Sequence, residues 1–184
     1  MRPVFRKPKT VVGNNLIFRN ATIDDATFIL ELRTDNKKAT HISSTSNDLW
    51  RQEAWLEGYK NDNQQVYFII TNNDNERVGT VRLYDSKNDS FCWGSWILKD
   101  GLPSSYAIES ALLVYEFALS LGFEKAHFDV RKGNQSVWRF HERFGAKRIE
   151  ETASDFIYNI SLDAIKLSLK KYEKYLPGRY AIKY

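Results

Sequence analysis

Three apolar segments in the middle of the chain, separated only by short turns, constrain the fold more than any other feature. Residues 65–71, 77–84 and 91–98 are rich in β-branched and aromatic side chains, as strands are. Residues 72–75 (NNDN) and 85–89 (DSKND) lie between them and consist mostly of residues that favour turns. Connections this short join neighbouring antiparallel strands. The sequence therefore predicts a three-stranded antiparallel meander.

The last of these segments is irregular. Phe91 and Trp93 alternate with smaller residues, whereas Trp96 is followed directly by two further apolar residues. The phase changes at Gly94 and Ser95, and a glycine inside a strand often marks a bulge. We expect a bulge or a splay at this point, which leaves backbone amides in need of a partner.

Helical spacing of apolar residues occurs on both sides of the meander. Thr22-x-x-Asp25 resembles a capping box that opens a helix through residue 33, and residues 104–121 form the longest helix. Residues 48–59 form another. Its bulky side chains are expected to fill the core, with the lining of a cavity as the alternative: Leu49, Trp50, Ala54, Trp55 and Leu56.

A short helix follows the strand predicted for residues 125–131. Asn134 opens this helix and Gly145 ends it. The spacing i, i+3, i+4 and i+7 places four side chains on its inward face: Val137, Phe140, His141 and Phe144. An imidazole therefore lies at the carboxyl edge of the predicted sheet, where α/β proteins bind ligands.

Strands at residues 16–20, 147–150 and 155–160 and a helix from residue 162 to about residue 175 complete the predicted elements. Their order predicts one α/β (α+β) domain over residues 1–184, with a mixed, mostly antiparallel sheet flanked by helices. We expect a loose N-terminal arm over residues 1–15, a core over residues 16–161, and a C-terminal helix and tail over residues 162–184. A chain of 184 residues, 42% of them hydrophobic, can bury one substantial core.

Charge and cysteine content exclude several classes of protein. The net charge is +4 with opposite charges interspersed, which suits an anionic small ligand better than a nucleic acid. Cys92 is the only cysteine, so we expect no disulfide, no thiolate metal site and a reducing, cytoplasmic compartment. No apolar run is long enough to cross a bilayer, and we expect no membrane partner.

Three segments, in this order, resemble motifs of the GNAT N-acetyltransferase superfamily, and the resemblance covers about residues 16–161. Residues 94–98 (GSWIL) resemble the central strand whose backbone pairs with the pantetheine arm of acetyl-CoA. Residues 104–109 lie where the family's pyrophosphate-binding loop runs into a helix, and residues 134–146 resemble the motif in which an asparagine contacts the cofactor arm. The resemblance implies a GNAT fold, acetyl-CoA as the acetyl donor and no metal.

The pyrophosphate-binding loop departs from the family pattern. Leu102 stands in place of an Arg or Gln and Ser105 in place of the first Gly, whereas Ala107 keeps the small residue. Amides at a helix N-terminus still bind phosphate through their hydrogen bonds and the helix dipole. The alternative is that Ser104 and Ser105 are ordinary N-caps with no ligand.

His141 is a second departure, because many family members carry Tyr there as the acid that protonates the departing thiolate. A histidine with an ordinary pKa of ~6.5 gives or takes a proton near neutral pH. The alternative is a hydrogen-bonded core histidine. The resemblance implies His141 and Asn134 as catalytic residues and the following acetyl-CoA site: Trp96, Ile97, Leu98, Ser104, Ser105, Tyr106, Ala107, Ile108, Asn134 and His141.

The acceptor side is less clearly marked. Arg33 and Asp35 resemble a segment that borders the acceptor pocket in RimJ/RimL-type and sugar-nucleotide acetyltransferases. The candidate substrate residues are Arg33, His41, Trp50 and Trp93. His41 is equally consistent with a solvated loop residue, and aromatic side chains more often fill a core than stack on a base or sugar.

These features together predict an acetyl-CoA-dependent N-acetyltransferase that acts on the primary amine of a small, anionic molecule. The leading interpretation of this acceptor is an amino sugar on a nucleotide carrier, as in surface glycan biosynthesis. A RimJ/RimL-type protein N-terminal acetyltransferase is the first alternative. A non-catalytic acyl-CoA-binding module is the second, because the pyrophosphate-binding loop is altered. A homodimeric assembly is left open.

Overall fold

The computed structural model describes residues 2–35, 47–178 and 180–184. Within them, one mixed sheet of nine strands has the order β7-β8-β6-β5-β4-β3-β2-β1-β9. Strands β5 and β6 run parallel, and the other neighbours run antiparallel. The strands are β1 (Thr10–Val12), β2 (Leu16–Asn20), β3 (Val66–Asn72), β4 (Arg77–Lys87), β5 (Ser90–Leu98), β6 (Lys125–Arg131), β7 (Lys147–Glu151), β8 (Asp155–Ile160) and β9 (Ala181–Lys183).

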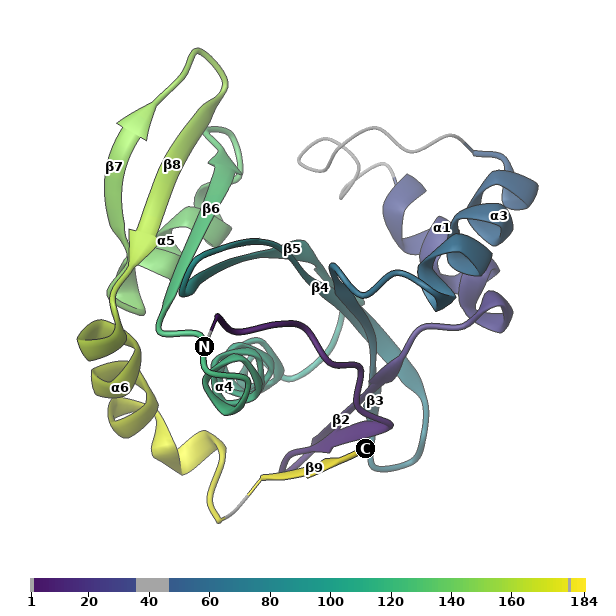
Figure 1. The fold of residues 1–184 in the computed structure, drawn as a ribbon, viewed down its shortest axis with the longest axis horizontal. Helices are drawn as coiled ribbons and strands as arrows, with labels where there is room; N and C mark the ends of the chain where they lie inside the picture. Colours follow the sequence, from purple (N-terminus) through teal and green to yellow (C-terminus); the bar gives the residue numbers. More distant parts are fainter. Residues whose placement is uncertain (1, 36–46, 179) are drawn as a thin grey trace.

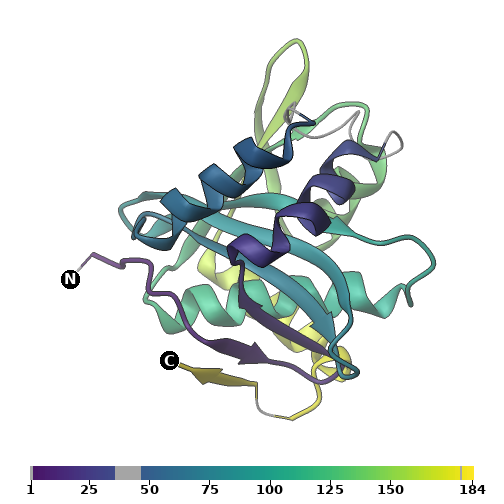
Figure 2. The same cartoon turned by 90° about the vertical axis from the view of Figure 1, so that its right-hand side faces the viewer.

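Helices cover both faces of this sheet. Figures 1 and 2 show α4 (Ser105–Ser120) on one face, with α1 (Ala26–Thr34) and α3 (Leu49–Lys60) across the other. The short 3-10 helix η1 (Ile23–Asp25) leads into α1. Helix α5 (Gln135–Arg143) follows β6, and α6 (Leu162–Lys171) and the 3-10 helix η2 (Glu173–Tyr175) follow β8. The mixed sheet, the β3–β4–β5 meander and the helices that the apolar spacing predicts are therefore confirmed.

Two apolar clusters join these layers. The larger one lies between α4 and the sheet, and the smaller one lies between the sheet and the α1–α3 pair. Fully or almost fully buried members of the larger cluster are Phe18, Phe68, Leu113, Tyr115 and Phe117. Members of the smaller cluster are Ile29, Leu56, Tyr59, Ile69 and Ile97. Because the sheet is covered on both faces, its central strands are apolar on both sides.

The interpretation of residues 1–15 as a loose arm is wrong for Phe5 and for residues 10–12. Residues 10–12 form β1, which pairs with β2 and with the C-terminal strand β9, at the edge seen in Figure 2. Val11 is fully buried, and the Phe5 ring lies 5.0 Å from that of Phe123. A strand of three residues has no recognisable alternation, so its pairing depends on contacts remote in the sequence.

The prediction that α3 buries its bulky side chains is also largely wrong. Leu49, Trp50 and Trp55 are 41%, 64% and 37% exposed, and the buried residues of this helix are Leu56 and Tyr59. The helix forms the outer layer of its face, and only one stripe of it contacts the sheet.

A buried carboxylate fixes the start of α4 relative to the sheet. Glu109 is fully buried, and its Oε1 accepts hydrogen bonds from the backbone amides of Asn14, Asn15 and Leu16 at 2.8, 2.7 and 3.0 Å. The turn between β1 and β2 is thereby tied to the first turns of α4. Backbone donors that surround a carboxylate in this way compensate for its lost hydration.

Candidate active site

The sheet opens at its centre because β5 and β6 diverge. The two strands pair only at Ser90 with Lys125 and at Phe91 with Ala126, and beyond these positions they separate, as Figure 1 shows. The predicted splay of this strand is confirmed. Among the described residues, the edge of β5 that faces β6 has no strand partner over residues 92–97, so backbone groups there can pair with a ligand.

A bulge on β5 lies beside this opening. Thr80 of β4 faces Ile97 and Arg82 faces Gly94, so β5 contains one residue more than β4 between these pairs. Ser95 lies in the bulge with a φ of 46°, a left-handed conformation that strains a residue with a side chain. The Thr80 hydroxyl donates to the Ser95 carbonyl at 2.8 Å, which holds the bulge in place.

Helix α1 also contacts the bulge. Arg33, near the end of α1, donates from Nη1 to the Ser95 hydroxyl at 3.1 Å. The bulge is therefore connected to the helix that precedes residues 36–46. Arg33, a predicted substrate residue, lies beside the predicted cofactor strand.

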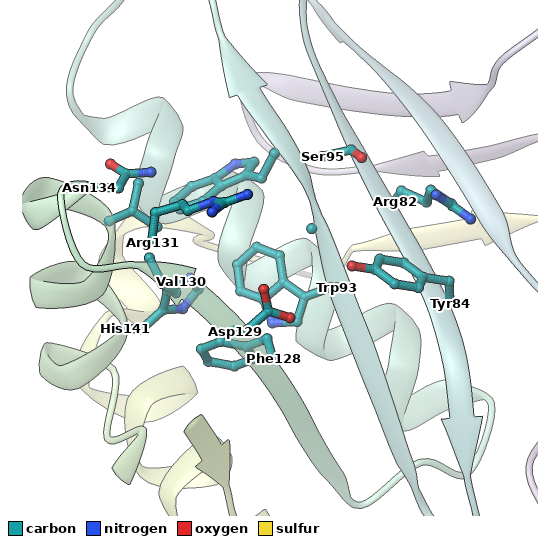
Figure 3. Close-up of a pocket in the computed structure, with 13 residues that line it drawn as sticks. Arg82, Tyr84, Trp93, Ser95, Phe128, Asp129, Val130, Arg131, Asn134 and His141 are labelled. Carbon is teal, nitrogen blue, oxygen red and sulfur yellow. The ribbon is translucent and has the colours of Figure 1, made fainter. Parts of the chain in front are cut away.

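A cavity of about 260 Å³ lies between the diverging strands, and we call it the central cavity. Figure 3 shows side chains from β4 on one side and from β6 and α5 on the other. Strand β4 contributes Arg82 and Tyr84. Residues 93–96 of β5 and residues 128–131 of β6 also line it. Three residues at the start and in the middle of α5 complete the lining: Asn134, Val137 and His141.

His141 is buried in an aromatic environment at this cavity. It is 5% exposed, and its ring centroid lies 4.2 Å from that of Phe128 and 5.0 Å from that of Trp93. Burial lowers the pKa of His141 to about 3, so the imidazole is neutral at physiological pH and the expectation of an ordinary pKa is wrong. Its Nδ1 has no hydrogen-bond partner within the described residues. This nitrogen therefore does not make the hydrogen bond that a core histidine would be expected to make.

Asn134 lies at the position that the sequence motif predicts, immediately before α5. Its carbonyl accepts from the amides of Val137 and Trp138, both at 3.2 Å, but its side chain does not cap the helix. The side chain instead lines the central cavity, as Figure 3 shows. An amide group that plays no part in capping is well suited to contact a ligand there.

A second cavity, of about 460 Å³, adjoins the first and shares Trp96 and Val137 with it; we call it the helix cavity. It lies between α4 and α5, and four of the predicted cofactor residues line it: Trp96, Ser104, Ala107 and Ile108. Trp96 is fixed between the two cavities because its Nε1 donates to the Ser110 hydroxyl at 3.0 Å. Ser104 occupies the N-cap position of α4, yet its side chain makes no capping bond.

The remaining predicted site residues are dispersed. Trp93 lines the central cavity and is 3% exposed, whereas Trp50 lies on the exposed face of α3, away from the lining of either cavity. Ile97 packs into the core beneath α1, and Leu98 and Tyr106 pack against the larger apolar cluster. His41 lies outside the described residues. Ser105 begins α4.

Four polar residues of the central cavity escaped the sequence analysis: Arg82, Tyr84, Asp129 and Arg131. Arg82 stands between Val81 and Leu83, both fully buried in the larger cluster. A charged residue in the middle of a strand with buried neighbours is the signal that identifies this position.

Within the described residues, no three His, Cys, Asp or Glu side chains gather into a group able to bind a metal. None of the helices described is long and apolar enough to span a bilayer.

Residues 15–147 match the family model of the acetyltransferase (GNAT) domain. The protein belongs to the GNAT acetyltransferase family. Among solved structures, "Apo FdhC, a nucleotide-linked sugar GNAT" is 39% identical, with a TM-score of 0.80 over 94% of this chain and 99% of that chain. The spermidine N-acetyltransferase from Vibrio cholerae, solved with CoA and spermine, has the same fold, with 14% identity and a TM-score of 0.76 over 83% of this chain and 98% of that one. No curated protein matches the chain significantly.

This membership makes the protein an acetyl-CoA-dependent N-acetyltransferase. The residues present fit an acyl-CoA. The unpaired edge of β5 offers backbone groups to an extended amide-containing arm, and the N-terminal amides of α4 lie at the helix cavity, where they suit a phosphate.

Proposed function

We propose that the protein transfers an acetyl group from acetyl-CoA to the amino group of a nucleotide-linked amino sugar. The observation that carries this proposal is the similarity to FdhC, at 39% identity over nearly the full length of both chains. The central cavity supports it, because its lining carries two guanidinium groups, those of Arg82 and Arg131, and one carboxylate, that of Asp129, and this net positive charge favours an anionic acceptor.

The acetyl donor would lie along β5 and reach α4. The unpaired edge of β5 around Trp96 would hold its amide-containing arm, and Asn134 lies on the opposite side of the same opening. The helix cavity, with Ser104 and the start of α4, would hold its pyrophosphate. The amino group of the acceptor enters the central cavity and meets the thioester beside the bulge at Ser95.

The reaction requires one bond to form, one to break and one proton to move. The amine nitrogen attacks the thioester carbonyl carbon, negative charge builds on the carbonyl oxygen, and the carbon–sulfur bond then breaks. Backbone amides at the β5 bulge are the donors that stabilise the oxygen. The nitrogen must lose a proton, and the departing sulfur must gain one.

We assign this proton movement to His141. A neutral imidazole accepts a proton at one ring nitrogen and donates from the other, so it can carry a proton from nitrogen to sulfur. The aromatic rings around it exclude water and keep it neutral before each cycle. Its buried Nδ1, which has no partner among the residues that the structure describes, supports this assignment, because buried polar atoms normally have a partner and a ligand can supply one.

A thiol-release assay tests the proposed function. The purified protein is incubated with acetyl-CoA and one amine at a time: UDP-linked and dTDP-linked amino sugars, spermidine, and a peptide with a free N-terminus. We expect free CoA to appear with a nucleotide-linked amino sugar, and the acetylated sugar to be found by mass spectrometry. Turnover of the peptide or of spermidine, with none of the nucleotide-linked sugars, would overturn the proposal.

A further inference from the structure

A cation that has no ionic partner among the described residues lines the central cavity. Arg82 is half-buried on β4, and it forms no ion pair within the described part of the chain. Other arginines do: Arg19 lies 2.7 Å from Asp25, and Arg148 lies 2.9 Å from Glu142. Burial is the main reason that the pKa of Arg82 is lowered. A half-buried guanidinium without a counter-charge is unfavourable unless an anion approaches it.

The guanidinium of Arg82 is nevertheless held in a fixed orientation. Its Nε donates to the side-chain carbonyl of Gln65, and Gln65 donates in turn to Asp62. The guanidinium carbon lies 4.5 Å from the ring centroid of Tyr84 and 5.4 Å from that of Trp55. One hydrogen bond and two aromatic faces thus set the plane of the group. An arginine held in this way loses little conformational entropy when it binds a ligand.

The size of the central cavity indicates which part of the acceptor this arginine meets. Its volume of about 260 Å³ is below the roughly 300–1,000 Å³ that is usual for pockets that enclose whole ligands. A sugar ring with its adjacent phosphate is therefore a better match than a complete nucleotide sugar. Trp55 is 37% exposed on the α3 side of Arg82, and we expect the rest of the nucleotide to lie outside the cavity on this side.

We infer that Arg82 forms a phosphate-binding subsite for the acceptor, fixed by Gln65 and by the rings of Tyr84 and Trp55. The inference rests on the proposed function, because it assigns the anionic part of a nucleotide-linked acceptor to a specific side chain. The two unused Nη groups of the guanidinium suit two phosphate oxygens, as in the bidentate contacts that arginine makes to phosphates. Arg82 thereby determines specificity for a phosphate-linked acceptor over the free amino sugar.

Steady-state kinetics of Arg82→Met test this subsite. We expect the KM for a nucleotide-linked amino sugar to rise roughly tenfold to hundredfold, as the loss of a charged hydrogen bond predicts. The KM for acetyl-CoA and the KM for the free amino sugar should stay within about twofold of the wild-type values. Arg82→Lys should recover part of the loss, because it keeps the charge but not the planar fork. An unchanged KM for the nucleotide-linked sugar would overturn the inference.

Two further variants separate the subsite from general damage. Gln65→Leu removes the side chain that orients Arg82, and it should raise the acceptor KM several-fold with kcat nearly unchanged. Arg139→Met replaces an exposed arginine of α5 that lines neither cavity, and it should change neither parameter. Equal effects of the Arg82 and Arg139 variants would contradict a specific subsite.

Binding of dTDP and UDP keeps the two proposals distinguishable. If the wild-type protein acetylates no nucleotide-linked sugar, the proposed function fails, but titration calorimetry with these two nucleotides still tests Arg82. Binding to the wild type that is lost in Arg82→Met supports the phosphate subsite. Absence of binding to the wild type, or equal affinity of the two proteins, overturns it.

Discussion

The two sides of the central cavity differ in charge and in the way their principal side chains are held. On the α5 side, His141 is neutral and surrounded by the rings of Phe128 and Trp93. On the β4 side, Arg82 keeps its charge and is oriented by the side-chain carbonyl of Gln65. The surroundings of His141 therefore exclude water, and the surroundings of Arg82 attract an anion.

This difference indicates a division of labour within one cavity. Proton transfer benefits from a low-dielectric environment in which the reacting groups are not solvated. Recognition of an anion instead requires a charge that is preorganised at the surface of the cavity. The bulge at Ser95 on β5 lies between the two sides, where the amine and the thioester would meet. Variants of His141, of Ser105 at the start of α4 and of Ser95 in the bulge separate these contributions, in order of decreasing effect.

Substitution of His141 should have the largest effect on activity. His141→Gln removes the group that we assign to proton transfer, and kcat is expected to fall by about a hundredfold, within the usual range for a general acid or base. Stopped assays of CoA release measure this change. Affinity for acetyl-CoA, measured by calorimetry, should be largely retained. Full turnover by the variant would make His141 a structural residue and leave the aromatic side of the cavity without a catalytic group.

The neutral state of His141 should be visible in the pH dependence of stability. Its pKa in the folded protein is about 3, below the ordinary value of 6.5, so the unfolded chain binds more protons between these pH values. The free energy of unfolding consequently decreases as pH falls below about 6.5. His141 contributes about 1.4 kcal/mol per pH unit to this decrease. Urea denaturation at about pH 7 and about pH 5 measures the loss, which we expect to be about 2 kcal/mol smaller in His141→Phe. Identical losses would contradict a buried, neutral imidazole.

A charge at the start of α4 should separate donor binding from acceptor binding. Ser105→Glu places a carboxylate where we expect the pyrophosphate of acetyl-CoA, and affinity for acetyl-CoA should fall about tenfold because like charges repel. Ser105→Gln is the neutral control of the same size and should bind nearly as the wild type does. Equal affinities of the two variants in a calorimetric titration would place the pyrophosphate elsewhere. Neither variant should alter binding of the acceptor.

Relief of the backbone strain at the bulge should have the smallest of the predicted effects. Ser95→Ala removes the hydroxyl that accepts from Arg33, and Ser95→Gly removes the same hydroxyl together with the strain of the φ of 46°. The glycine variant should therefore be more stable than the alanine variant by about 1 kcal/mol, which thermal unfolding measures. A glycine variant of equal or lower stability would show that the left-handed conformation stores no strain.

The regular elements of the fold could be predicted from the sequence because their signals are local. The meander, the long helix α4 and the helix after Asn134 follow from turn residues and apolar spacing. Strand β1 could not be predicted, because three residues carry no periodicity and Val11 is buried only through its pairing with distant strands. The exposure of Trp50 depends on which stripe of α3 meets the sheet, and an aromatic stripe does not reveal that.

The candidate site was predictable on one side only. The motif at Asn134 and His141 and the irregular strand at Gly94 were recognised, and the structure brings all three to one cavity. The lowered pKa of His141 depends on rings from two other elements, which no local pattern contains. Arg82 lies in no motif; its place between two apolar residues of a strand marks it, but the absence of an ionic partner among the described residues is visible only in three dimensions. The cytoplasmic location, the homodimer and the absence of a nucleic-acid partner stay predictions.

A double-mutant kinetic cycle tests the division of labour most directly. Wild type, His141→Gln, Arg82→Met and the double variant are compared with one nucleotide-linked amino sugar at saturating acetyl-CoA. We predict that His141→Gln lowers kcat with little change in the acceptor KM, and that Arg82→Met raises this KM with little change in kcat. The two changes in activation free energy, calculated from kcat/KM, should add to within about 0.5 kcal/mol. Loss of the same kinetic parameter in both single variants, with strongly non-additive effects, would contradict the account.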